Sequence, residues 1–149
     1  MRTIPPPSGD GAKGVQGERT LHPILTPEER QRLFWEGLDL FNGDQFFEAH
    51  ESWEAIWRST TPEPKDLFQG LIQLAAGMHH WAVRHRPAVA ARVLAKGRVR
   101  LDPFRPYSHG LDLELLIEAV LEWEEWLVEP VAAPPPVARI EVVNSDAVR

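Results

Sequence analysis

The side chains best suited to chemistry occur close together, in the stretch His50-Glu51-Ser52-Trp53-Glu54. His50 and Glu54 are four residues apart, so a helix would place them on one side, with Glu51 one step further round. Divalent metal ions accept imidazole and carboxylate ligands, and a carboxylate beside a metal-bound water can act as a general base. The spacing therefore raises the hypothesis of a small metal-assisted active site.

A second polar group follows in the segment 66–84, which is apolar around most of the helical circumference and therefore typical of a central helix. Its remaining sector carries three polar side chains in one line. Polar groups that are buried without partners cost about 1–3 kcal/mol each, so this line is expected to face the His50 helix. The predicted polar seam between the two helices has six members: His50, Glu51, Glu54, Gln69, Gln73 and His80.

One interpretation of the seam is a metal centre. In it His50, Glu54 and His80 ligate a divalent ion, and the amides of Gln69 and Gln73 orient the ligands. The first two ligands then resemble the His-Glu-x-x-His helix of zinc metalloproteases, with glutamate in place of the second histidine.

Two carboxylates are the candidate catalytic groups of that centre. Glu51 is placed to act as the base toward a bound water, and Glu48, three residues earlier, could share acid–base work with it. The alternative is that both belong to a solvated helix face, where most carboxylates lie.

The other interpretation is structural. Buried polar side chains that satisfy one another form networks that determine how two helices dock. His79 and His80 are adjacent and cannot both face one seam, and spacing alone leaves the two interpretations open.

The positions of the prolines predict the architecture, because proline inside a helix removes a hydrogen bond and clashes with the preceding turn. Between them lie long segments rich in Leu, Ala, Glu and Arg, which predict an all-α bundle of about five helices. Thr26, Asp44 and Asp112 are the expected N-caps of the first, second and last helices. Pro87 is expected to open the fourth.

The two ends differ in composition from the middle of the chain. Residues 1–20 and 131–149 are rich in proline and glycine or lack helical periodicity, so we expect flexible segments on either side of a helical domain at 21–130. Within the C-terminal part, 139–143 could instead form a short strand or dock on a partner. A frayed tail is the expected state.

Overall composition excludes several classes of protein. The 149-residue chain has no cysteine, so a disulfide, a thiolate nucleophile and a cysteine-ligated metal are excluded. Its net charge of −6 argues against a general nucleic-acid binder. It lacks an apolar stretch of membrane-spanning length and a signal peptide of the usual type, so we expect a cytoplasmic protein that does not enter membranes.

Charged and aromatic residues suggest partners. Residues 84–105 carry seven basic residues against one acidic residue, and 112–129 carry seven acids and no base, so these two helices are expected to pair opposite charges. The basic stripe could also attract an anionic substrate. Six tryptophans indicate an aromatic core, and surplus aromatics leave a homodimer open. The expected pairing joins two stripes, Arg92, Lys96 and Arg100 with Glu114, Glu118 and Glu122.

Two motifs together resemble a known family. They are Glu48-Ala49-His50-Glu51-x-x-Glu54 and Gly70-Leu71-Ile72-Gln73 followed by His79-His80. Over about 30–116 the chain is similar to the bacterial and archaeal family 309 of domains of unknown function. The resemblance implies a small all-α protein, sometimes labelled a predicted metal-dependent hydrolase, with its motif histidines and glutamates at these positions.

Two functions follow as hypotheses. The first is a metal-dependent hydrolase that acts on a small-molecule substrate at the seam, with an unidentified divalent metal as cofactor. The second is a non-catalytic helical interaction module in which the seam is structural, similar in its helix–turn–helix units to tetratricopeptide proteins but without their repeat of about 34 residues.

Overall fold

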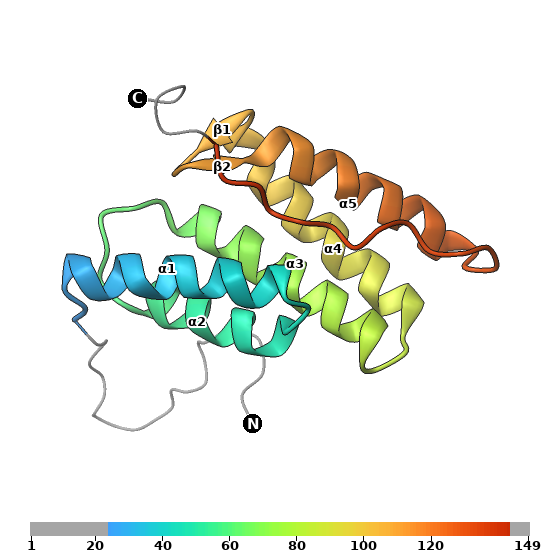
Figure 1. Cartoon of the computed structure of the whole chain (residues 1–149), viewed down its shortest axis with the longest axis horizontal. Helices are drawn as coiled ribbons and strands as arrows, with labels where there is room; N and C mark the ends of the chain where they lie inside the picture. The colour runs from blue at the N-terminus through green and yellow to red at the C-terminus, as the bar shows by residue number, and fades with distance from the viewer. Residues whose placement is uncertain (1–23, 144–149) are drawn as a thin grey trace.

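The computed structural model describes residues 24–143. It is an all-α bundle of five helices with one very short hairpin (Figure 1), as the proline pattern predicts. The flexible segment predicted at 1–20, and the last six residues of the predicted C-terminal tail, lie outside the described residues. The elements are α1 (Pro27–Asn42), α2 (Phe46–Arg58), α3 (Lys65–Ala82), α4 (Pro87–Leu101), the 3₁₀ turn η2 (Asp102–Phe104), β1 (Tyr107–Ser108), β2 (Leu111–Asp112) and α5 (Leu113–Val128).

Three of the four predicted helix starts are confirmed. The Thr26 hydroxyl accepts from the backbone N–H of Glu29, whose carboxylate accepts in return, and this completes a capping box. Pro87 opens α4, and the Asp112 carboxylate caps α5. The prediction for Asp44 is wrong: this residue has a positive φ of 65° in the turn, and α2 starts after Gln45 without a side-chain cap.

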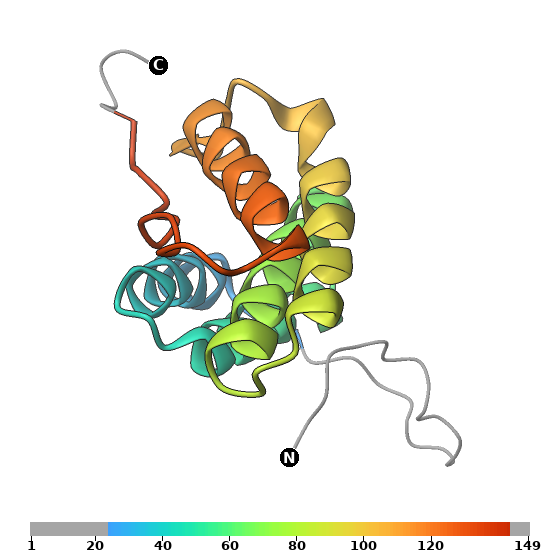
Figure 2. The same ribbon diagram turned by 90° about the vertical axis from the view of Figure 1, so that its right-hand side faces the viewer.

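Helix α3 occupies the middle of the bundle. Each helix packs mainly on its neighbour in sequence, and α3 lies between α2 and α4 (Figure 2). The contact with α4 is close because both helices present glycine, and a Cβ added to Gly97 would lie 2.8 Å from the carbonyl oxygen of Gly70. The apolar circumference of α3 is therefore buried on two sides at once, as the sequence predicts.

The tryptophans line the core, as predicted. Trp53 and Trp123 are fully buried, and the other four are partly buried against the same cluster. The ring of Trp53 passes under α1 at Gly37 and donates from Nε1 to the carbonyl oxygen of Phe34 at 3.1 Å. This contact joins α1 to α2.

The expected pairing between charged stripes on α4 and α5 is wrong in its details. Arg98 pairs with Glu124 at 2.5 Å and Arg105 with Glu114 at 2.7 Å, so oppositely charged groups do meet. Arg100, however, turns to α3 and pairs with Asp66 at 2.9 Å.

Within residues 24–143, no helix combines the length and apolar character that crossing a membrane requires.

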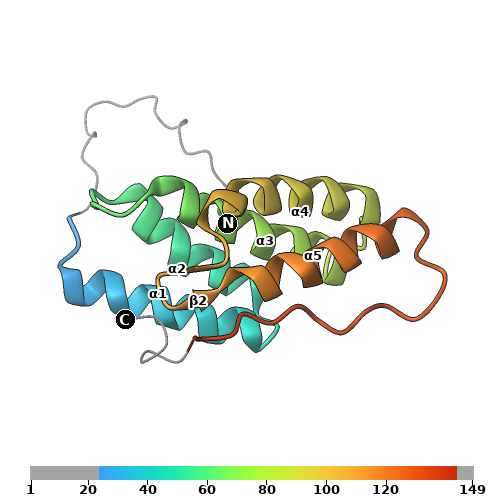
Figure 3. The same ribbon diagram turned by 90° about the horizontal axis from the view of Figure 1, so that it is seen from above.

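The C-terminal segment 131–143 is packed where a frayed tail was expected. It runs back along α5 toward the hairpin, between α5 and α1 (Figure 3). Ala138 and Ile140 are buried, and Val142 forms a bridge with Leu111 of β2. The alternative of a short strand within 139–143 is therefore closer to the structure.

Side chains of the helices supply the hydrogen bonds that hold this segment. The Asn42 side chain donates to the carbonyl oxygen of Ile140 and accepts from its N–H, both at 2.9 Å. The indole N–H groups of Trp123 and Trp126 donate to the carbonyl oxygens of Pro136 and Ala132. The composition of the segment alone does not reveal these partners.

Replacing Ile140 with alanine tests whether the segment contributes to stability. Its side chain is 2% exposed, so Ile140→Ala is expected to lower the free energy of unfolding by about 2–5 kcal/mol in a urea titration. Val131→Ala is the control in the same segment, because Val131 is 81% exposed and should change stability by less than about 0.5 kcal/mol. Equal effects of the two substitutions would contradict the packing.

Candidate functional site

Helix α2 buries the two motif residues that spacing placed on one side. His50 is 1% exposed and Glu54 is 2% exposed, which is unusual for groups that can carry charge. Arg58, one further turn along, extends from a half-exposed position and pairs with Glu54 at 3.3 Å. The Glu54 carboxylate is thus buried in the bundle beside the Arg58 guanidinium.

The three polar side chains predicted to line α3, Gln69, Gln73 and His80, differ in their hydrogen-bond partners. The Gln73 side-chain oxygen accepts from Nε of Arg100 at 3.1 Å, so this amide faces α4. Oε1 of Gln69 and Nδ1 of His80 are buried atoms that have no hydrogen-bond partner among the described residues. The structure therefore separates Gln73 from the predicted seam, because an arginine on α4 competes for it.

Two residues that the sequence analysis did not select lie in this region. The ring of Phe47 stacks on the ring of His50, with 5.8 Å between their centroids. Phe47 also contacts the ring of His79, with 5.6 Å between centroids. His79 is thus linked to the α2 motif through Phe47. The signal was present, because Phe47 lies one helical turn before His50, but an apolar ring between two histidines is not part of a ligand pattern.

Histidines 79 and 80 sit in an environment that disfavours their charged forms. Partial burial is the main cause that lowers the pKa of each. Arg84 lowers both pKa values further, and Glu48 opposes the shift at His79. Arg86 and the neighbouring His79 add to the shift at His80. Each imidazole therefore loses its proton at a lower pH than an ordinary histidine does, and neutral imidazole is the form that can bind a metal.

The predicted ligand set is not assembled in this structure. Among the residues from 24 to 143, no three His, Asp or Glu side chains are grouped so that they could hold a metal ion. Glu48 is exposed and Glu51 is half-buried on the α2 surface. The catalytic and metal roles assigned to these residues from sequence stay predictions.

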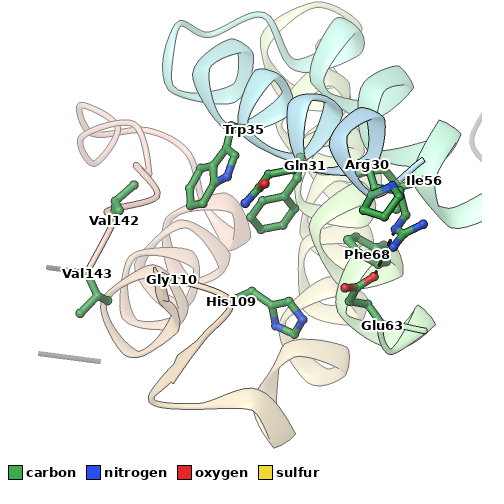
Figure 4. Close-up of a pocket in the computed structure, with 12 residues that line it drawn as sticks. Arg30, Gln31, Trp35, Ile56, Glu63, Phe68, His109, Gly110, Val142 and Val143 are labelled. Carbon is green, nitrogen blue, oxygen red and sulfur yellow. Dashed lines mark ion pairs between the residues drawn. The ribbon is translucent and has the colours of Figure 1, made fainter. Parts of the chain in front are cut away.

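A cleft of about 550 Å³ lies elsewhere, and the sequence analysis did not anticipate it (Figure 4). It is bounded by the first half of α1, the loop between α2 and α3, the turn between β1 and β2, and the end of the C-terminal segment. Sequence could not reveal it, because its walls come from segments that are far apart along the chain. The lining residues used below are Arg30, Phe34, Trp35, Glu63, Phe68 and His109.

Aromatic rings and one ion pair determine the character of the cleft. Phe34 contacts Trp35 and Phe68 edge to face, with centroids 5.0 and 6.2 Å apart. At one side Arg30 pairs with Glu63 at 3.6 Å, and His109 points into the space between this pair and the hairpin turn (Figure 4). The cleft thus combines apolar walls with a donor and an acceptor.

The shifted histidines predict how stability depends on pH. Above the ordinary histidine pKa of 6.5, both histidines are neutral in the folded and in the unfolded protein, so they do not change the free energy of unfolding. Below pH 6.5 the unfolded protein binds protons at these histidines more readily than the folded protein. The free energy of unfolding therefore falls with pH until the lowered pKa of the folded state is passed. Urea titrations at about pH 7.5 and about pH 5.5 should show a smaller loss for the variant carrying His79→Gln and His80→Gln than for the wild type. Arg84→Gln should also reduce the loss, because it removes the cation that disfavours protonation. An unchanged loss in the double variant would refute the shifts.

Comparison with known proteins finds a family match for the middle of the chain. Residues 34–93 match the family model described as "Domain of unknown function (DUF309)". Searches among curated proteins and among solved structures find no match. The match contains α2, α3 and both motifs, so the resemblance is confirmed for this stretch. Residues 34–93 of this chain therefore belong to the DUF309 family of domains of unknown function.

Proposed function

We propose that this protein is a non-catalytic helical binding module that takes a small ligand in the cleft beside α1. The observation that carries the proposal is the cleft itself, whose volume of about 550 Å³ falls within the range of small-molecule sites. Such sites are mostly apolar, with few polar groups that orient the ligand. Four aromatic rings and the Arg30–Glu63 pair match that description.

In this proposal the polar residues of α2 and α3 have a structural role. Glu54 pairs with Arg58 one turn later on α2, and Gln73 accepts from Arg100 of α4, so these two members of the predicted seam have different partners. Breaking a pair that includes a buried carboxylate is costly, because the remaining groups lose their compensation. The first pair then stabilises α2 itself and the second joins α3 to α4, so both support the scaffold on which the cleft is built.

Filling the cleft tests the proposal. Gln31 is exposed on α1 and lines the cleft, so Gln31→Trp should weaken the binding of small aromatic fragments at least tenfold, as followed by amide shifts of Gly110 and Val143 in NMR spectra. Arg32→Trp is the matched control, since Arg32 is the exposed neighbour on α1 that does not line the cleft.

A second control separates the two regions. Glu54→Gln should lower the free energy of unfolding by about 1–3 kcal/mol and leave fragment binding unchanged. The proposal fails if no fragment shifts the cleft amides, or if the fragments that bind perturb residues of α2 and α3 instead.

A metal-dependent hydrolase is the second candidate. It is favoured by the burial of His50 and Glu54 within the DUF309 stretch and by the buried atoms Gln69 Oε1 and His80 Nδ1, which lack a hydrogen-bond partner among the described residues. His50, Glu54 and His80 are suitable donors for a divalent ion. As described above they are not grouped to hold one, so this candidate requires their side chains to move together.

Metal analysis decides this candidate. Protein purified without chelators should carry about one divalent ion per chain, and His50→Ala should lose it while retaining its helical circular dichroism. His85→Ala is the control, because His85 is an exposed histidine on the turn between α3 and α4. Absence of stoichiometric metal in the wild type, with or without added zinc or manganese, excludes the candidate.

A further inference from the structure

We infer that the ligand of the cleft is an uncharged, planar heteroaromatic molecule with a hydrogen-bond donor beside an acceptor on one edge, as a nucleobase has. This inference rests on the proposed function and adds the chemical class of the ligand. It depends on the shape of the walls, on the ion pair at one side, and on the position of His109.

The walls favour a flat aromatic body. Phe34 and Phe68 are almost fully buried and present their rings from α1 and α3 in an edge-to-face arrangement, while Trp35 is half-buried at the side bordered by Val142 and Val143 (Figure 4). The His109 ring lies 6.5 Å from Phe34 at a tilt of 51°. Aromatic rings at these distances gain from offset or edge-to-face contacts, which a planar ligand can extend.

The Arg30–Glu63 pair presents a donor and an acceptor side by side. The guanidinium Nη1 already donates to the carbonyl oxygen of Leu25, and Nε lies 3.6 Å from Oε1 of Glu63. The Arg30 side chain is only 17% exposed, so its direction is constrained by the surrounding chain. An amide or nucleobase edge, with donor and acceptor adjacent, is complementary to this pair of donor and acceptor groups.

A charged ligand fits less well. A carboxylate on Arg30 would face the negative Glu63, and an ammonium group on Glu63 would face the positive Arg30. Displacing either partner would leave the other charge without its partner, and the Arg30 side chain is only 17% exposed. The net charge of −6 opposes an anion further.

The hairpin turn aims His109 toward the ligand. The residue has a positive φ of 54°, and its Nδ1 is bonded to the Ser108 hydroxyl at 2.8 Å, which leaves Nε2 as the other polar atom of the ring. Gly110 follows with φ of 79°, and a Cβ there would lie 3.3 Å from the Trp35 ring. The turn therefore packs on Trp35 and holds the imidazole over the cleft.

The site combines residues inside and outside the family match. Arg30, His109, Val142 and Val143 fall before or after residues 34–93, and Phe34 is the first matched position. The DUF309 stretch supplies the aromatic floor of the cleft and Glu63, and the flanking segments supply Arg30, His109 and the rim. Ligand selection thus depends on residues from both parts of the chain.

Three probes test the ligand class on the full chain: adenine, which has adjacent donor and acceptor, indole, which has only a donor, and benzoate, which is anionic. Binding is followed by amide shifts of Gly110 and Val143. Adenine should bind roughly three- to tenfold more tightly than indole and benzoate. Glu63→Ala should remove this advantage and leave indole unchanged, whereas Glu122→Ala, an exposed glutamate of α5, should change neither.

The outcomes separate the inference from the proposed function. Tightest binding by benzoate, or adenine binding that Glu63→Ala does not weaken, overturns the ligand class while the cleft remains a binding site. Absence of shifts at Gly110 and Val143 with all three probes, up to their solubility limits, overturns both.

Discussion

The burial of α3 on two sides is the constraint on which the bundle depends. An apolar helix of 18 residues can leave water only if neighbours cover it from more than one direction, and α2 and α4 do so. Glycines at the α3–α4 crossing bring the backbones close, whereas α2 buries the larger side chains of His50 and Glu54. The central helix therefore has a tight, small-residue interface with α4.

A bundle in which each helix packs mainly on the next leaves its first and last members with little contact. Segment 131–143 fills that space between α1 and α5, and Asn42 holds it through two hydrogen bonds with Ile140. Its last residues pair with the hairpin, so the N–H of Val143 donates to the carbonyl oxygen of Gly110 at 2.8 Å. The cleft is a consequence of this closure, because the segment and the hairpin form its far wall against α1.

Local rules predicted the local features and failed where partners come from distant segments. Thr26 and Asp112 cap helices because hydroxyl and carboxylate groups satisfy nearby N–H groups whatever the rest of the chain does. Gln73 was placed in the seam because its competitor, Arg100, lies 27 residues later. The packing of 131–143 depends on indole and amide donors of α5 and α1, and the cleft on segments from α1 to the C-terminal segment, so neither has a signature in any one stretch.

The motifs of α2 and α3 lie inside the family match, whereas the cleft is lined by residues inside and outside it. The DUF309 stretch contains the central helix α3 and the buried His50 and Glu54 of α2. The polar side of the cleft takes Arg30 and His109 from outside this stretch and Glu63 from within it. Changes in the flanking segments can alter the polar side of this cleft without disturbing α3, because loops at the surface tolerate substitution better than the buried helix they cover.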